Sequence, residues 1–265
     1  MILRLGYTLR HKDSFANNDE TKEDIISNLP DSLLIDILSL LFLSEVKQTR
    51  IVSKRWKNLF AFLPNLYFVM KSYEQVKETR VLVDQTLAIR GDIPIEKLLL
   101  KCEKKCDYDC FYDLLCTLVR FKAGVRELEL SVLWDLGDRH EVKFSWDLFK
   151  AWDSLVGLTL DCGFILDVYN DDELIFPCLK KISLICIGYA SEESVVNLIS
   201  SCPVLEELYV ERAWFDDWLE VFNISSLSLK RLRISFIHLR SRDYKVVIDA
   251  PKLECIFIND HLTNH

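Results

Sequence analysis

Three evenly spaced cysteines, Cys102, Cys106 and Cys110, come nearest in this sequence to the spacing of a metal site, and Cys116 follows them. Tetrahedral zinc sites typically join one close pair of cysteines to a second, distant pair. A run of cysteines with three residues between neighbours does not reproduce that arrangement. We therefore expect these thiols at the end of a strand and in the segment after it, and we predict no metal site.

Other residues that could do chemistry lack the partners that the chemistry needs. His261 and His265 are four residues apart, but no Glu stands beside the first. Residues 170–173, Asn-Asp-Asp-Glu, lack the Gly and the distal Glu of a calcium-binding EF-hand loop, which favours a solvated turn. The five histidines are scattered, and no G-x-S-x-G, Walker or G-x-G-x-x-G pattern is present. We predict a non-catalytic chain without a cofactor.

The composition limits the class of protein and of partner. With 265 residues, half of them apolar, the chain can bury a sizeable core. Its formal net charge of −8 argues against a surface that tracks phosphates, so we expect no nucleic-acid partner. The nine cysteines lie mostly in apolar runs, as free thiols do in a reducing compartment, which favours the cytoplasm or the nucleus. No apolar run approaches the roughly 18 residues of a membrane span, so we expect no membrane partner.

An amphipathic helix is predicted to begin near residue 30. Pro30 suits its first turn because that turn needs no amide hydrogen, and Asp31 puts a negative charge at the positive end of the helix dipole. Two shorter helices are expected after the capping residues Ser44 and Ser53. Five apolar residues share the spacing of one side of the first helix: Leu33, Leu34, Ile37, Leu38 and Leu41. A unit below about 40 residues rarely builds a sufficient core alone, so we expect this helical unit to pack against a partner.

A strand and a helix are predicted to join this unit to the rest of the chain. Leu66, Phe68 and Met70 alternate with other residues, which suits a short strand or an extended link. Residues 74–89 contain no Gly or Pro and indicate a helix, which Gly91 is suited to end.

From residue 95 onward the pattern apolar-x-x-apolar-x-apolar occurs seven times. Its middle positions are 98, 128, 158, 182, 208, 232 and 256, so successive units are 24 to 30 residues apart. This period is typical of a leucine-rich repeat, whose last two apolar positions point to one side of a strand and pack on neighbouring units. Pro177, Pro203 and Pro251 each stand two residues before a unit, where a ring without an amide donor can precede a strand.

The segments that return from one strand to the next are predicted to be helical in places. Residues 110–121 and 191–201 favour helices, and Ser191 can cap the second. The seven strands are therefore expected to form one curved parallel sheet with helices and loops on its outer face. The fold class is α/β, with a helical unit before the sheet.

Residues 24–68 resemble the F-box of the plant F-box and leucine-rich-repeat proteins. The likeness rests on Leu-Pro-Asp-Ser-Leu-Leu at 29–34, Ile-Leu-Ser at 37–39 and Val-Ser-Lys-Arg-Trp at 52–56, and the chain departs from the family pattern at Phe42, Leu43 and Lys47. The resemblance implies a three-helix module that binds the Skp-type adaptor of a cullin-based (SCF) ubiquitin ligase. It assigns nine residues to adaptor binding: Leu29, Pro30, Leu33, Leu34, Ile37, Leu38, Leu41, Val52 and Trp56.

The second half of the chain resembles the repeats of the same family, most clearly at residues 201–208 and 247–254. The resemblance implies a flexible leader at 1–23, the F-box at 24–68, a linking strand and helix at 69–94, and about seven repeat strands at 95–265. Many relatives continue into a C-terminal FBD domain, which we expect this chain to lack because it stops at His265. A last repeat without a polar cap is expected to expose apolar surface.

The residue between the two inward positions of each strand is expected to face solvent and to contact a target protein. A loop rich in tryptophan is a second candidate, because aromatic residues are over-represented at binding hot spots. The alternative is that these rings pack on the convex side as ordinary core. The predicted target-binding residues are Glu129, Thr159, Ser183, Tyr209, Arg233 and Phe257 on the strands, and Trp214 and Trp218 in the loop.

The resemblance implies a substrate-recognition subunit of an SCF-type ligase, which binds the adaptor and through it a cullin, and holds a target protein on the sheet. The alternative is a stand-alone repeat scaffold whose F-box-like region only caps the solenoid, in which case Leu33, Ile37 and Leu41 would be buried within the chain. A small-molecule receptor is a third possibility, and it has no support beyond analogy of fold.

Overall fold

The computed structural model describes residues 28–39, 55, 59–103, 108–120, 124–133, 142–144, 152–169, 175–213, 219–237 and 245–261. The helices are α1 (Asp31–Ser39), the short 3-10 helix η1 (Phe60–Phe62), α4 (Tyr73–Arg90), α5 (Tyr108–Arg120) and α6 (Glu192–Ser200). The strands are β1 (Asn65–Met70), β2 (Ile95–Glu103), β3 (Val125–Leu133), β4 (Val142–Phe144), β5 (Gly157–Asp161), β6 (Phe164–Leu166), β7 (Lys181–Ile185), β8 (Gly188–Tyr189), β9 (Glu207–Ala213), β10 (Val221–Ser225), β11 (Arg231–Ile237), β12 (Lys245–Asp249) and β13 (Cys255–His261).

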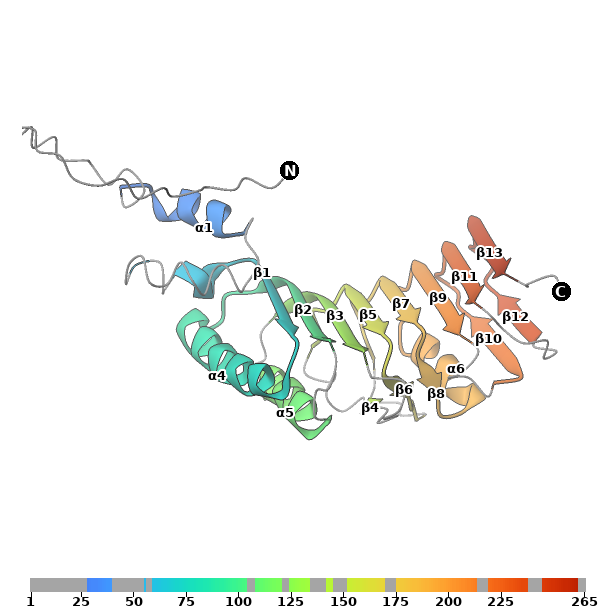
Figure 1. Cartoon of the computed structure of the whole chain (residues 1–265). Helices are drawn as coiled ribbons and strands as arrows, with labels where there is room; N and C mark the ends of the chain where they lie inside the picture. The colour runs from blue at the N-terminus through green and yellow to red at the C-terminus, as the bar shows by residue number, and fades with distance from the viewer. Residues whose placement is uncertain are drawn as a thin grey trace, which may run out of the picture.

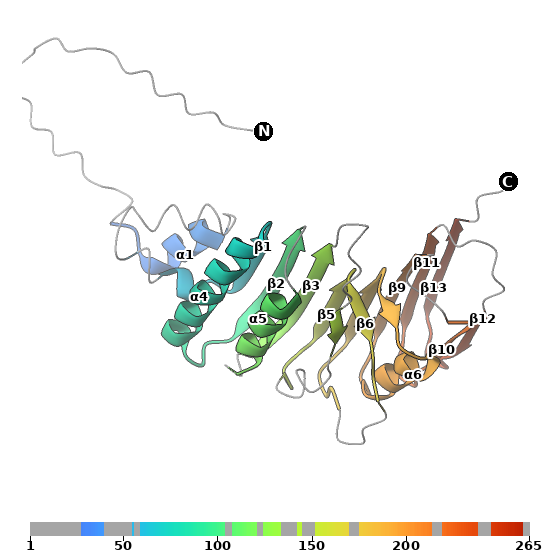
Figure 2. The same cartoon turned by 60° about the horizontal axis from the view of Figure 1, so that its bottom comes forward.

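The fold is mixed α/β and is built on one parallel sheet. Eight strands lie side by side in the order β1-β2-β3-β5-β7-β9-β11-β13, each next to the neighbouring repeat (Figure 1). Helices α4, α5 and α6 lie on one face of this sheet (Figure 2). We call the opposite face the open face.

The repeat pattern fixes which side chains form the core, as predicted. All three apolar positions are buried in each of the first six units, from Ile95, Leu98 and Leu100 to Leu229, Leu232 and Ile234. The sheet has one strand more than the seven predicted, because the alternating segment at residues 65–70 is β1 and pairs with β2. Its inward side chains are Leu66, Phe68 and Met70, and all three are buried.

The seventh unit differs because it is the last in the sheet. Leu253 is only partly buried, while Ile256 and Ile258 on β13 are 49% and 51% exposed. The equivalent residues of the unit before, Leu232 and Ile234, are fully buried. The expectation of exposed apolar surface on the last repeat is therefore confirmed.

Tight turns lead into the repeat strands at the prolines, also as predicted. The amide of Leu205 donates to the carbonyl of Cys202 at 3.2 Å, and that of Leu253 donates to Ala250 at 3.1 Å. Pro203 and Pro251 thus occupy the second position of a four-residue turn, where the fixed proline φ is favourable and no amide hydrogen is needed.

The predicted helix at 74–89 is α4. It begins after Ser72, whose hydroxyl oxygen accepts a hydrogen bond from the Gln75 amide at 3.3 Å. It ends at Gly91, which has φ +60° and ψ −132°, a conformation open essentially to glycine alone. The predicted helix at 191–201 is α6, but Ser191 makes no capping bond to its backbone, and its hydroxyl lies 3.3 Å from that of Ser194 instead.

Two small parallel sheets lie beside the main one and were not predicted. They have the orders β4-β6-β8 and β10-β12. Their strands are two to five residues long, too short for the alternation of apolar residues to stand out in the sequence.

The cysteines differ from expectation at one position. Cys102 is disulfide-bonded, whereas the sequence predicts free thiols. Among the described residues, six cysteines form no disulfide: Cys116, Cys162, Cys178, Cys186, Cys202 and Cys255. Cys106, residues 170–173, His265, the leader and the helices expected after Ser44 and Ser53 lie outside the described residues, except Arg55 and Leu59. Within the described part of the chain, no helix is long and apolar enough to cross a membrane.

Candidate interaction surfaces

Helix α1 has apolar side chains on two sides, one turned into the protein and one turned to solvent. Leu34 and Leu38 are fully buried in the core. Leu33 and Ile37 are 48% and 41% exposed, and they lie four residues apart, so they share one face of the helix. A helix that already packs through one apolar side therefore presents a second apolar face to solvent.

Helix α1 is held to the chain by its buried leucines and by Arg55. The Arg55 guanidinium donates to an Asp31 carboxylate oxygen at 2.8 Å and to the Leu29 carbonyl at 2.7 Å. Both charged side chains are largely exposed, and such pairs contribute little, roughly 0–1 kcal/mol. Burial of Leu34 and Leu38 is consequently the main source of stability at this contact.

Arg90 joins the N-terminal segment to the first repeat. Its guanidinium is buried and donates hydrogen bonds to the carbonyls of Ala61 at 2.8 Å, Leu63 at 2.6 Å and Ile93 at 2.7 Å, and also to Pro94. Burial lowers the pKa of Arg90. No sequence pattern indicates this role, because an arginine in a last helical turn is ordinarily an exposed partner of the helix dipole.

The structure places the nine predicted adaptor-binding residues in three groups. Leu33, Ile37 and Pro30 are exposed, and Leu29 is half-buried. Leu34 and Leu38 are inside the chain, so they support the helix and are not available to a partner. The positions outside the described residues are Leu41, Val52 and Trp56.

The predicted target-binding residues on the strands form one row across the open face. Strand pairing puts each of them directly opposite the next: Glu129, Thr159, Ser183, Tyr209, Arg233 and Phe257. The first four are half-buried, while Arg233 and Phe257 are exposed. Trp214 and Trp218 lie outside the described residues.

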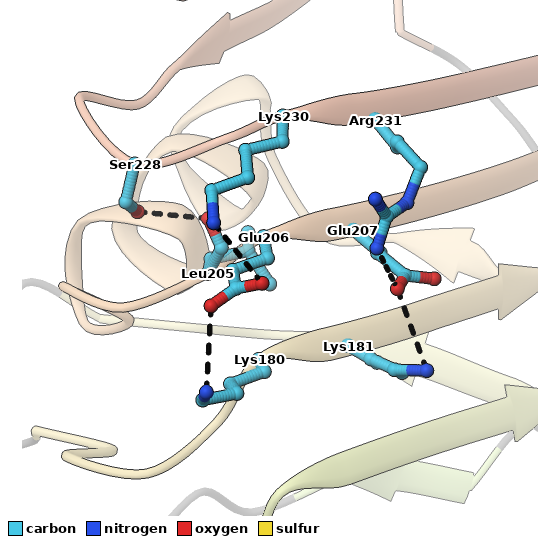
Figure 3. Close-up of polar contacts among 8 residues, drawn as sticks. All are labelled: Lys180, Lys181, Leu205, Glu206, Glu207, Ser228, Lys230 and Arg231. Atoms are coloured by element: carbon cyan, nitrogen blue, oxygen red, sulfur yellow. Dashed lines mark hydrogen bonds and ion pairs between the residues drawn. The ribbon is translucent and has the colours of Figure 1, made fainter. Parts of the chain in front are cut away.

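A ladder of charged residues runs beside this row on β7, β9 and β11. The Glu207 carboxylate lies between Lys181, 3.4 Å away, and Arg231, which donates a hydrogen bond to it (Figure 3). The hydrogen bond from Arg231 and the neighbouring Lys181 lower the pKa of Glu207. The sign of the charge alternates from one repeat to the next, so each carboxylate is shared by two cations.

A second ladder lies one residue earlier in the same repeats. The Glu206 carboxylate is 3.4 Å from the ammonium groups of both Lys180 and Lys230, and these contacts lower its pKa (Figure 3). The Ser228 hydroxyl donates to the Leu205 carbonyl at 2.8 Å just before the strands. Both ladders could have been predicted from the sequence. Residues of alternating charge recur at the repeat period, one and two residues before the middle apolar position of the units that contain β7, β9 and β11.

A hollow of about 380 Å³ lies on the open face at β7, β9, β11 and β13. Its lining combines polar and charged residues of the row and of the first ladder with apolar residues, and Phe257 lies at its β13 side. The apolar members are Ile182, Leu208, Leu232 and Cys255. The Tyr209 hydroxyl donates to Glu211 at 2.5 Å, and burial together with this bond raises the pKa of Tyr209 to about 12. Among the described residues no group of three or more His, Cys, Asp or Glu side chains is placed to hold a metal ion.

Comparison of the sequence with known proteins identifies the family of the chain. A family model described as "FBD-associated F-box protein At5g56370, LRR repeats" matches residues 118–265, more than half of the chain. The F-box domain model matches residues 26–67, which include α1. The chain belongs to the F-box/LRR-repeat family. The resemblance found in the sequence is thereby confirmed, and the repeats are of the type associated with FBD proteins.

Individual members of the family match along most of the chain. F-box/LRR-repeat protein 13 of Arabidopsis thaliana is 32% identical over 90% of the chain, and F-box/FBD/LRR-repeat protein At4g00160 of the same plant is 34% identical over 90%. The chain spans about half the length of the curated relatives it matches, 52% for each of these two. No solved structure matches it significantly.

Proposed function

We propose that this chain is a substrate-recognition subunit of an SCF-type ubiquitin ligase, in which α1 and its neighbours bind a Skp-type adaptor and the open face of the sheet binds a target protein. The observation that carries the proposal is the exposed pair Leu33 and Ile37 on α1, within the residues that match the F-box model. Exposed apolar side chains that cluster on one face of an element are typical of protein-binding surfaces.

The alternative, a stand-alone repeat scaffold, predicts a different environment for the apolar residues of α1. If this region only capped the solenoid, its apolar residues would be turned into the chain. Leu34 and Leu38 are buried as this alternative predicts, but Leu33 and Ile37 are exposed. The division of one helix into a buried and an exposed apolar face favours the adaptor.

The mechanism that we propose is proximity. A chain that holds a target beside a ubiquitin-conjugating enzyme raises the effective concentration of the two reactants, and it needs no catalytic residue of its own to do so. The adaptor joins the chain to a cullin, and we place the assembly in the cytoplasm or the nucleus.

Co-expression with a Skp-type adaptor tests the proposal. The double variant Leu33→Asp/Ile37→Asp puts two charges on the exposed face of α1 without touching the core. We expect wild type to co-purify with the adaptor and this variant to remain folded but unbound. The matched control is Val81→Asp/Ile89→Asp, which charges two exposed apolar residues of α4. The control should bind like wild type, and equal binding by both double variants would refute this role for α1.

A further inference from the structure

The hollow on the open face carries an excess of positive charge. Lys181, Arg231 and Arg233 line it together with a single acidic residue, Glu207. The Glu207 carboxylate is already shared between Lys181 and Arg231, so it cannot also neutralise Arg233. The hollow is therefore a cationic site in a chain whose formal net charge is −8.

Arg233 is positioned to receive an anion. Its guanidinium lies over the Phe257 ring, 5.3 Å from the ring centroid, and it makes no ion pair among the described residues. The N–H groups of a guanidinium point outward in its own plane. A cation held over an aromatic face therefore keeps these donors available to a ligand. The aromatic ring thus holds the cation in place without using its hydrogen-bond donors.

Glu211, which lies two residues after Tyr209 on β9, already has partners of its own. One oxygen of Glu211 accepts the Tyr209 hydroxyl at 2.5 Å, and the other lies 3.4 Å from the Cys186 thiol. The Ser183 hydroxyl, also in the lining, has no hydrogen-bond partner within the described part of the chain. The site therefore offers unused donors from Arg233 and Ser183.

We infer that this hollow binds a carboxylate or phosphate group on an acidic segment of the target protein, with Arg233 as the main contact. This inference rests on the proposed function, because it names the class of target for the same open face. Charge-assisted hydrogen bonds from arginine to such groups are roughly twice as strong as neutral ones, and they are directional. The rest of the lining then supplies shape and a second cation, Arg231.

The neighbouring part of the open face carries no excess of positive charge, which argues against a nucleic acid. A smaller hollow of about 140 Å³ shares Lys181 and Ser183 with the first one but is lined by Glu127 and Glu129. Lys97 pairs with Glu129 at 2.9 Å, and the two lysines of this lining are matched by its two glutamates. A uniform polyanion laid along the face would find no excess of cations at this second hollow, whereas a protein segment can place its acidic residues over β9 to β13 alone.

Fluorescence anisotropy with labelled peptides tests the inference on the full chain. The probes are hexaglutamate, hexaphosphoserine, hexaglutamine and hexalysine, with oligothymidylate as the nucleic-acid probe, at about 0.1 M salt so that screening does not hide the contact. We expect the two acidic peptides to bind and the other two peptides not to bind. The ratio of affinities for hexaglutamate and hexaphosphoserine separates a carboxylate from a phosphate ligand.

Three substitutions make the test specific to the hollow. Arg233→Gln should weaken binding of the acidic peptides roughly tenfold, the effect of losing one hydrogen bond to a charged group. Glu207→Gln should strengthen it, because the only acidic residue of the lining loses its charge. Arg126→Gln removes an exposed arginine that pairs with Glu96 at the other end of the sheet and should leave binding unchanged.

The peptide-binding measurement can contradict the inference and leave the proposed function unaffected. If Arg233→Gln and Arg126→Gln bind the acidic peptides equally, or if oligothymidylate binds more tightly than either of them, the inference is wrong. Adaptor co-purification is measured on the same variants and does not depend on the open face. Failure of wild type to co-purify with the adaptor, with binding of the acidic peptides retained, would refute the proposed function alone.

Discussion

Arg90, in the last turn of α4, donates a hydrogen bond of 2.6 Å to the carbonyl oxygen of Leu63, next to the short helix that packs on α1. The same guanidinium reaches Pro94, just before β2. One buried side chain thus fixes the geometry between the segment that carries the proposed adaptor surface and the first repeat of the sheet.

Arg90→Met should therefore destabilise the protein strongly. Methionine keeps much of the apolar stem but leaves the carbonyls of Ala61, Leu63 and Ile93 without this donor. An unsatisfied buried polar group costs about 1–3 kcal/mol, and water can reach part of this site, so we expect a total loss of about 2–4 kcal/mol. Urea denaturation measures it. The control Arg126→Met replaces an exposed arginine on β3 and should change the free energy of unfolding by less than about 0.5 kcal/mol.

Gly91→Ala tests the backbone conformation that ends α4. A Cβ at Gly91 would meet no atom within 4 Å, so the cost comes from the backbone alone. At φ +60° and ψ −132° we expect a loss of about 1–3 kcal/mol in urea denaturation. Gly157→Ala is the matched control, because its Cβ would make an ordinary contact of 3.5 Å with Glu127 and its φ is not positive. Equal effects at the two glycines would show that the conformation of Gly91 carries no strain.

The repeat period was enough to predict the buried positions, but not the orientation of α1. Each repeat strand has a period of two, so its pattern names the inward side chains directly. The stripe on α1 is wider: Leu33 and Leu34, like Ile37 and Leu38, are neighbours in sequence, and both pairs fit one apolar side. Only the position of η1 and the following residues decides that Leu34 and Leu38 turn inward. Arg90 was missed for a similar reason, because its partners are backbone carbonyls, which have no sequence signature.

The ladder at Glu207 should make stability depend on pH. Because its folded pKa lies below its unfolded value, this carboxylate stabilises the protein at neutral pH, and the contribution is lost as the pH falls through the folded pKa. Glu207→Gln removes the charge and should cost no more than about 1 kcal/mol at neutral pH, because the pairs are partly exposed. Thermal unfolding followed from pH 7 downward checks this.

The difference between wild type and Glu207→Gln should vanish in acid, and added salt should reduce it at neutral pH. Asp153→Gln serves as the control, since this exposed carboxylate makes no hydrogen bond or ion pair within the described part of the chain. A difference that stayed constant down to acid pH would assign the effect of the substitution to packing and not to charge.

The exposed apolar residues of β13 should make this chain self-associate. Ile256 and Ile258 occupy core positions of the repeat, yet about half of each side chain meets solvent, beside the open edge of the sheet. Ile256→Thr/Ile258→Thr keeps the β-branched shape that suits a strand and lowers the apolar area. We expect less light scattering at equal concentration and a nearly unchanged free energy of unfolding.

The same double substitution one repeat earlier should do the reverse. Leu232→Thr/Ile234→Thr alters residues that are fully buried, and truncation of such side chains costs about 2–5 kcal/mol each. This variant should lose stability and scatter more light, because its unfolded population rises. If the β13 variant instead lost stability to the same extent, its isoleucines would be part of the core in solution, covered by a second copy of the chain, and its concentration-dependent unfolding would reveal that dimer.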